Sequence, residues 1–561
     1  MSIAFCSRNL VFGGRSALRK GPPVFTSRSS PRLRLQQPIV CHHSYQAGTK
    51  TRSRKGAAIA VVSTVASIYA LCRPRTALAE ESQKPRHLIR LHEIHEHNRS
   101  SDTYWVFRGD RVYDITEWIP NHPGGEVILR AAGGNIQPYW EIFTIHQKDY
   151  VYEILEQYFI GNIDPQDLVD GRAPVGHVDD PFTSDPIRND SLIARSDRPC
   201  NAETPKQALS TFITPNDMFY VRNHLWVPET GNGDQHRLTI EMMDGTEIEY
   251  TMSDLRRKFK EYRVTATMQC SGNRRAHMTA GSRATNGLQW DIGAISNAEW
   301  TGVRLRDVLK DAGLGVDELP EGARHAQFVG AEAYGASIPI EKAVDSRGDV
   351  LLAYEMNGEP LPRDHGFPLR VIVPGHVAAR SVKWVNKIMV SNEESTSQWQ
   401  RRDYKCFGPN EGKTPDWDRA VSIQEMPVQS AIVSISKVAM DRLKNSRLAQ
   451  VYGLEEDSIV LQGYAFAGGG RKIVRVDVSP DNGRTWQQAE LPHHDARGTK
   501  TWTWSQWRIA FARRDIQETF LVKAVDESYN TQPDSFTAHY NFRGNLTSGW
   551  HRVEASVLEE S

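Results

Sequence analysis

The chain has 561 residues, too many for one hydrophobic core, so its length predicts several domains. Basic (Lys+Arg) and acidic (Asp+Glu) residues number 68 each, and this zero net charge gives no general attraction to nucleic acid or acidic membranes. The 6 cysteines include no CxxC pair, which argues against a zinc site or a disulfide framework.

The N-terminal segment, residues 1–79, differs from the remainder in charge. No acidic residue precedes Glu80, whereas arginine and serine are frequent, as in an organelle transit peptide. An apolar run at 57–72, too short for a standard membrane span, is followed by the small-residue motif Ala77-Leu78-Ala79. This layout resembles a cleaved mitochondrial presequence for the intermembrane space, with no stable membrane insertion after processing. A membrane anchor retained at 57–72 and a plastid-lumen signal are the alternatives.

A small domain is predicted for residues 85–163. Two short strands surround a turn at Gly109-Asp110; His122 directly precedes Pro-Gly-Gly, and His146 ends an apolar helical pattern. Two neutral imidazoles on opposite faces of a haem give a six-coordinate iron that carries electrons and binds no substrate. The segment resembles cytochrome b5, whose His-Pro-Gly-Gly motif is intact. The resemblance implies haem b, with His122 and His146 as its iron ligands.

Residues 164–190 are rich in proline, glycine and aspartate and show no apolar period. This composition predicts an extended, flexible linker that would let the haem domain fold independently of the remaining chain.

The central region, residues 191–420, alternates short strands and helices and predicts an α+β domain. Cys270 ends an apolar strand and is followed by a Ser-Gly-Asn turn and two arginines. An isolated cysteine is most often a core residue, but a thiolate is also a soft metal ligand that nearby guanidinium groups stabilise. The stretch Tyr262 to Met278 resembles the molybdenum-ligating segment of the sulfite oxidase family, with Ser271 in place of the usual alanine. Cys270 is thereby implied as the molybdenum ligand.

Five further stretches match motifs of the same family in the same order: 219–228, 288–293, 363–370, 380–384 and 400–407. They imply a molybdopterin site, whose phosphate and anionic dithiolene need basic groups around them. His376 stands where the family usually has an apolar or aromatic residue. The implied cofactor-binding residues are Tyr220, Val221, Arg222, Asn223, His224, Cys270, His365, Arg370, Arg380, Ser381, Val382 and Lys383.

Residues 421–559 read as short alternating strands, with a strong turn signal at Asp481-Asn482-Gly483. This pattern predicts a β-sandwich, immunoglobulin-like but without its disulfide. The region resembles the dimerisation domain of sulfite oxidases, which implies a homodimer. Asn541 to Gly544 matches a family motif whose arginine reaches the substrate pocket, so Arg543 joins the predicted site.

The chain after residue 85 is identified as a member of the sulfite oxidase family, with a multidomain α+β architecture of haem domain, molybdopterin domain and immunoglobulin-like sandwich. The resemblance implies molybdenum-dependent oxygen-atom transfer from sulfite to sulfate, with electrons passing singly through the haem to cytochrome c. The implied catalytic residues are Arg222, Arg275, Trp290, Tyr404 and Arg543.

Two alternatives belong to other classes. A nitrate reductase would share the molybdenum fold, but in that family the haem domain follows the molybdenum domain, whereas here it precedes it. A non-enzymatic haem electron carrier with a dimer scaffold would have no use for Cys270 and its polar neighbours.

Overall fold

The structure is a computed structural model that describes most of the chain after the predicted presequence. The predicted presequence, with its apolar run at 57–72, lies outside the described residues. Within the described ranges, no helix is long and apolar enough to cross a membrane. The described residues are 87–122, 125–147, 149–174, 178, 180–331, 334–408, 411, 415–437, 451–452, 457–492 and 500–558.

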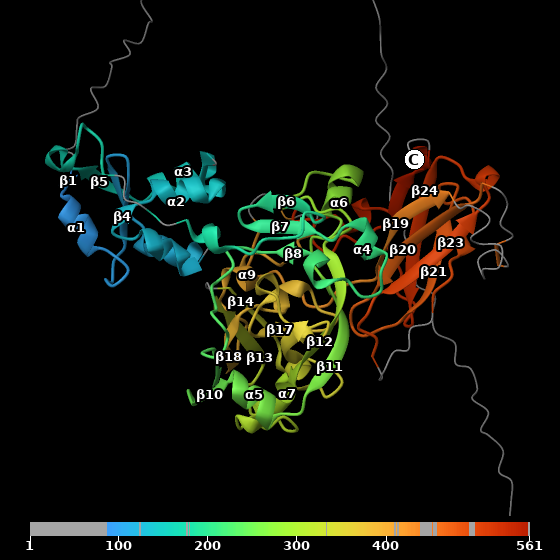
Figure 1. Cartoon of the computed structure of the whole chain (residues 1–561). Coiled ribbons are helices and arrows are strands. Elements are labelled where there is room, and N and C mark those ends of the chain that lie inside the picture. The colour runs from blue at the N-terminus through green and yellow to red at the C-terminus, as the bar shows by residue number, and fades with distance from the viewer. Residues whose placement is uncertain are drawn as a thin grey trace, which may run out of the picture. The chain divides into compact units, whose positions relative to one another are not determined.

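The first domain is built on a five-stranded sheet in the order β1-β5-β3-β2-β4 (Figure 1). Strands β2 and β3 pair antiparallel around Gly109, as the sequence predicts. Val106 and Phe107 are neighbours on β2 but enter different hydrophobic clusters, because successive strand side chains point to opposite faces. The elements are β1 (Leu88–Ile89), α1 (Leu91–Glu96), β2 (Trp105–Arg108), β3 (Arg111–Asp114), η1 (Thr116–Asn121), η2 (Gly125–Ala131), β4 (Gly134–Asn135), α2 (Gln137–Ile142), η3 (Thr144–Gln147), α3 (Asp149–Glu156) and β5 (Phe159–Ile163).

The predicted linker, residues 164–190, is attached to a domain at each end. Near its start, Arg90 of the haem domain donates two hydrogen bonds to Asp167, both of 2.8 Å. Near its end, Arg188 makes an ion pair with Asp364 of the central domain at 2.8 Å. Both attached residues, Asp167 and Arg188, therefore lie within the range 164–190 that the composition predicts to be a flexible linker.

The central domain combines three sheets with short helices. The larger sheets have the orders β10-β9-β18-β13-β14 and β11-β12-β15-β16, with β17 pairing with β15, and the smaller one has the order β6-β7-β8 (Figure 1). The predicted α+β class is confirmed. The strands are β6 (Ile193–Asp197), β7 (Cys200–Glu203), β8 (Val221–Arg222), β9 (Arg237–Glu241), β10 (Glu247–Thr251), β11 (Tyr262–Gln269), β12 (Ile295–Arg304), β13 (His325–Gly330), β14 (Gly335–Pro339), β15 (Leu351–Met356), β16 (Glu359–Pro360), β17 (Arg370–Ile372) and β18 (Val385–Ser391).

The helices of this domain are short and cover the sheets. α5, α7 and α8 contribute Leu255, Val308 and Ile340 to the largest hydrophobic cluster of the domain. The α-helices are α4 (Lys206–Leu209), α5 (Met252–Lys258), α6 (Arg275–Gly281), α7 (Leu305–Asp311), α8 (Ile340–Val344) and α9 (Gln398–Arg401).

The C-terminal domain consists of two sheets, β19-β20-β23 and β22-β21-β24-β25, as predicted for a β-rich domain. Leu461 of β20 and Val476 of β21 belong to one hydrophobic cluster, so the two sheets share a core. The predicted turn places Asn482 and Gly483 at φ 56° and 89° between β21 and β22. The immunoglobulin-like topology stays a prediction. The strands are β19 (Gln429–Lys437), β20 (Ile459–Phe466), β21 (Ile473–Ser479), β22 (Gln487–Gln488), β23 (Ser505–Phe511), β24 (Thr519–Asp526) and β25 (His551–Glu554).

Candidate active site

Cys270 lies directly after β11, in the turn that leads into α6. Its backbone N–H donates to the carbonyl of Ala294 at 3.0 Å, and its own carbonyl accepts from the N–H of Asn273, also at 3.0 Å. Arg274 takes the left-handed conformation, φ 65°, just before the helix begins. This tight turn fixes the cysteine at the end of a paired strand and leaves it 5% exposed.

The two arginines after Cys270 point to different partners. Arg274, fully buried, donates to the carbonyls of Ser430 (3.1 Å) and Gly549 (2.8 Å) in the C-terminal domain. Arg275 donates instead to the carbonyls of Arg543 (2.8 Å) and Leu288 (2.7 Å). Burial lowers the pKa of Arg275, and the charge of Cys270 acts against that shift. Arg274 thus links the central domain to the C-terminal domain. Arg275 is the arginine whose charge interacts with Cys270.

One pocket brings together most of the predicted site residues around Cys270. They come from β8, the β11–α6 turn, the segment around η8 (Arg363–His365), the segment before β18, and the turn after α9. Predicted residues that line it are Tyr220, Arg222, Asn223, His224, Cys270, His365, Arg370, Ser381, Lys383 and Tyr404.

Six predicted residues do not line this pocket. The side chains of Val221 and Val382 are buried in two hydrophobic clusters, so any contact of theirs with a cofactor would use the main chain. Trp290 packs in the same cluster as Cys270. Arg380 lies behind Tyr404, 6.0 Å from its ring centre, and donates to the carbonyl of Ile423 at 2.8 Å. The remaining two are Arg275 and Arg543.

Tyr404 and His224 form a hydrogen-bonded pair on the pocket wall, with 2.9 Å between Oη and Nε2. Burial, together with the charges of Arg222 and Lys383, holds the pKa of His224 well below its usual value, so the imidazole is neutral. Burial also raises the pKa of Tyr404. The tyrosine hydroxyl therefore stays protonated, and when Nε2 of the neutral imidazole carries the ring proton and donates to Oη, the hydroxyl proton is left for a ligand in the pocket.

Arg222 supplies a fixed positive charge to the pocket. It donates to the side chain of Asn201 at 3.0 Å. Burial works against its charge, but Tyr404 and Cys270 outweigh that effect and raise its pKa. The charged guanidinium is therefore stable in this buried place.

Arg370 and Lys383 form a second cationic group, beside His365. Arg370 donates to the carbonyls of His365 at 2.8 Å and Ser381 at 3.1 Å. Burial lowers the pKa of Arg370 to about 10 and that of Lys383 to about 7. Burial likewise lowers the pKa of His365 to about 4, so this imidazole is neutral. An anion bound here would favour the charged forms of both basic residues.

Several guanidinium nitrogens around the site are buried and, within the described part of the chain, have no hydrogen-bond partner. They are Nε of Arg370, Nη2 of Arg380 and Nε of Arg543. A buried donor without a partner costs about 1–3 kcal/mol, and more when it is charged. Donors of this kind fit an anionic ligand such as molybdopterin, whose phosphate and dithiolene accept hydrogen bonds. The residues present therefore fit this cofactor.

In the haem domain, His122 and His146 face each other with nearly parallel rings, 14° between planes and 6.1 Å between centres. Two imidazoles that ligate one metal from opposite sides need about this separation, since each metal–nitrogen bond is about 2 Å and the ring centre lies about 1 Å further. His146 Nδ1 bonds the carbonyl of Phe143 at 2.9 Å, which leaves Nε2 for a metal. Burial lowers the pKa of His146 and favours the neutral imidazole that a ligand requires. The pair fits a six-coordinate haem.

Comparisons with known proteins find a match for each of the three domains. The oxidoreductase molybdopterin binding domain matches residues 224–399, the Mo-co oxidoreductase dimerisation domain 420–557, and the cytochrome b5-like heme/steroid binding domain 90–164. Mitochondrial sulfite oxidase of Homo sapiens is 42% identical over 509 residues, covering 89% of this chain and 89% of that protein. The chain belongs to the sulfite oxidase family.

Two further matches have lower sequence identity. Nitrate reductase [NADH] 2 of Phaseolus vulgaris is 34% identical over 393 residues, covering 66% of this chain and 43% of that protein. The solved sulfane dehydrogenase SoxCD of Paracoccus pantotrophus superposes with a TM-score of 0.50 at 27% identity, covering 70% of this chain and 96% of that chain. The nitrate reductase alternative is therefore the more distant one. The predicted oxidoreductase class and the two cofactors, molybdopterin and haem, are confirmed.

The sequence does not single out one buried polar residue that contacts the segment after Cys270. Asn545 accepts hydrogen bonds from Ser271 and from Arg275 through its side-chain oxygen, both at 3.0 Å. It follows Arg543 by two positions, and Gly544 between them has φ 57° and no room for a Cβ, which would lie 2.6 Å from Arg275 Cγ. Its position directly after the matched motif Asn541 to Gly544 is the one sequence feature that could have pointed to Asn545.

His376, the predicted departure from the family pattern, lies outside the pocket lining. It is 5% exposed, and burial lowers its pKa to about 3, so it is neutral. The charges of Lys342 and of Arg380, a predicted cofactor-binding residue, also lower this pKa.

Proposed function

We propose that the protein is a sulfite oxidase that converts sulfite to sulfate and passes the electrons through its haem domain to cytochrome c. One observation carries the proposal. Cys270, the predicted metal ligand, opens onto a pocket shared with Arg222 and Arg370, and buried guanidinium nitrogens around it have no protein partner in the described ranges. A soft ligand and an anion-binding surface in one pocket suit an anionic molybdenum cofactor and an anionic substrate.

The chain's own residues have distinct tasks in this proposal. Cys270 holds the metal, and Arg370, Arg380 and Lys383 with His365 hold the pterin and its phosphate. When bound there, the molybdenum cofactor supplies oxygen-atom transfer and takes up two electrons.

Three arginines bind and orient sulfite. Arg222, Arg275 and Arg543 offset the negative charge of the substrate, so that it enters in a fixed orientation. Tyr404, held protonated beside neutral His224, donates a hydrogen bond to a substrate oxygen. Arg543 is itself positioned by an ion pair with Asp403. Trp290 packs beside Cys270 and helps keep water out.

Electron delivery is the task of the haem domain. His122 and His146 would hold the haem iron between them, and a haem held by two imidazoles would supply electron transfer and not substrate binding. Cytochrome c, a one-electron acceptor, is the proposed partner. We also infer a homodimer, because residues 420–557 match a dimerisation domain.

One measurement tests the proposal as a whole. Metal analysis of the purified full chain should give molybdenum and iron in equal amounts. Its optical spectrum should show a six-coordinate haem that becomes reduced when sulfite is added. A haem that stays oxidised with sulfite, in protein that contains molybdenum, would contradict sulfite as the substrate.

Two of the arginines proposed to bind sulfite, Arg275 and Arg543, give a graded prediction. Arg275→Met or Arg543→Met should raise the KM for sulfite about 10- to 100-fold, since a hydrogen bond to a charged group contributes about 1.5–3 kcal/mol. Steady-state kinetics at fixed ionic strength measure the effect. Arg263→Met is the control, because the Arg263 side chain is 60% exposed. Unchanged KM and kcat in both arginine variants would remove these arginines from the substrate site.

Location follows from the N-terminus and from the relatives. The acid-free segment 1–79 and the mitochondrial relatives support delivery to the mitochondrial intermembrane space. N-terminal sequencing of the protein from its native organelle should begin near Glu80. Full-length chain recovered from membranes would instead favour an anchor at 57–72.

A further inference from the structure

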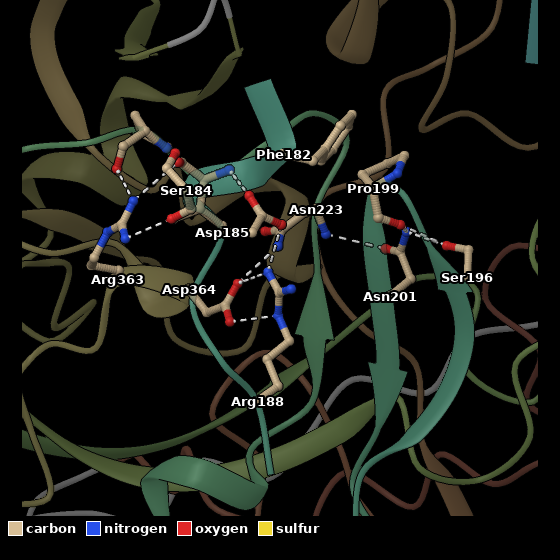
Figure 2. Close-up of polar contacts among 12 residues, drawn as sticks. Phe182, Ser184, Asp185, Arg188, Ser196, Pro199, Asn201, Asn223, Arg363 and Asp364 are labelled. Atoms are coloured by element: carbon tan, nitrogen blue, oxygen red, sulfur yellow. Dashed lines mark hydrogen bonds and ion pairs between the residues drawn. The ribbon is translucent and has the colours of Figure 1, made fainter. Parts of the chain in front are cut away.

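Asp364 is the centre of a hydrogen-bond network beside the cofactor pocket (Figure 2). The residue lies in η8 (Arg363–His365), next to His365, and is only 6% exposed. Its two carboxylate oxygens accept from Nε and Nη2 of Arg188 at 2.8 and 2.9 Å. This is a two-point guanidinium–carboxylate pair, the geometry that fixes both partners most firmly. Arg188 belongs to the segment in which the sequence predicts a flexible linker.

The same aspartate also holds two residues of the pocket. Its Oδ1 accepts from the side-chain amide of Asn223 at 2.9 Å, and its backbone carbonyl accepts from Lys383 Nζ at 2.8 Å. Lys383 in turn donates to the side-chain oxygen of Asn223. Asp364, Asn223 and Lys383 therefore form a closed ring, and Arg188 is attached to it from outside the pocket.

Independent contacts hold the Arg188 segment in place. Asp185 accepts from Arg188 at 2.9 Å and from the backbone N–H of Val227, also at 2.9 Å. Arg363 donates to the carbonyl of Ser184 at 2.8 Å, as Figure 2 shows. Arg188 thus has a second carboxylate and a fixed backbone, so it reaches Asp364 from a rigid base.

Electrostatics explain why Arg188 matters to this ring. Burial opposes the negative charge of Asp364, yet its pKa is lowered, first by Arg188 and further by Lys383. Without Arg188, Lys383 would be the main positive charge that still stabilises the buried carboxylate. It would then draw the Lys383 ammonium toward itself and away from an anion in the pocket.

We propose that Arg188 is a positioning residue of the molybdopterin site, which acts through Asp364 to fix Asn223 and Lys383. The proposal rests on the proposed function in one respect, that the pocket beside Cys270 holds molybdopterin. In this proposal the end of the predicted linker, residues 164–190, belongs to the molybdenum domain and supports its cofactor site. Loss of Arg188 should therefore weaken cofactor retention and leave the haem domain unaffected.

The test compares full-length variants by the molybdenum-to-haem ratio of the purified protein. Arg188→Met should lower this ratio about fivefold or more relative to the matched control Arg237→Met, whose side chain is 44% exposed in the same domain. The haem content should be equal in both. A wild-type chain without molybdenum would contradict the proposed function itself, whereas a loaded wild type with an equally loaded Arg188→Met would overturn only the present inference.

A double variant separates positioning from mere stability. Arg188→Met/Asp364→Asn removes the uncompensated charge, so its thermal midpoint should return toward that of the control. Its molybdenum content should stay low, because without the two-point pair to Arg188 the side chain at position 364 is no longer fixed in the orientation that holds Asn223. Recovery of both quantities would show a purely structural role and overturn the proposal. If neither methionine variant folds, Arg188→Lys decides: about a twofold loss of molybdenum supports the proposal, and full loading refutes it.

Discussion

Replacing Cys270 with serine should reduce sulfite oxidation by more than about 100-fold, since even residues that only support a metal ligand cost 10- to 100-fold when they are lost. A serine hydroxyl is far less acidic than a thiol and is a much poorer ligand for a soft metal. Cys270 is fixed by backbone hydrogen bonds to Ala294 and Asn273, so the substitution should leave the fold and the haem content unchanged. Sulfite-dependent reduction of ferricyanide measures the effect without involving the haem domain.

The control for this experiment is Cys406→Ser. Cys406 lies close to Tyr404 in sequence, but burial raises its pKa to about 12, so it remains a thiol and offers no thiolate to a metal. Its substitution should retain most of the activity. Substantial sulfite oxidation by the Cys270 variant, with the Cys406 variant unchanged, would assign Cys270 a structural role only.

The sequence predicted those segments whose conformation is determined by residues that are neighbours in the chain. The strand and turn around Cys270 could be read because an apolar run leads into a Ser-Gly-Asn turn, and the structure has β11 ending at Gln269. The histidine pair could be read because each histidine lies at a recognisable junction. Both predictions concern residues whose neighbours in the chain determine their conformation.

Contacts between distant segments were not predictable in this way. Asn545 bonds Ser271 although the two are 274 positions apart in the chain, and Arg188 bonds Asp364 from a segment whose composition suggests only flexibility. Nothing in periodicity or turn chemistry encodes such pairs, because each depends on how whole domains pack. The roles of Arg274 and Arg275 show the same limit, since the sequence has two equivalent arginines and only the packing of the C-terminal domain separates them.

The attachment of residues 181–190 also changes how the chain should be divided. A shortened chain that begins at Ser191 would lack both Asp185 and Arg188, which hold Val227 and Asp364. A molybdenum domain prepared on its own should therefore begin before Asp180, whose side chain caps η5 (Pro181–Ser184). The domain boundary follows the hydrogen bonds rather than the composition.

His122→Ala in the full chain should separate the two halves of the proposed reaction. Without one of the two facing imidazoles the haem would lose an axial ligand, and reduction of cytochrome c by sulfite should largely disappear. The pocket around Cys270 does not include this histidine, so sulfite oxidation with ferricyanide as acceptor should persist. The two acceptors are compared in steady-state assays on the same preparation, normalised to molybdenum content.

The matched control is His92→Ala, because His92 is an exposed histidine on α1 of the same domain. It should keep both activities and a normal haem spectrum. His146→Ala should repeat the behaviour of His122→Ala, since the two rings face each other at 6.1 Å and either loss leaves the iron with one protein ligand. If the His122 and His146 variants reduced cytochrome c as fast as the control, electrons would be leaving the molybdenum domain directly, and the relay through the haem would be wrong. Loss of both activities together would instead mean that the haem domain is needed for sulfite oxidation itself, which would contradict the division of tasks proposed for the two domains.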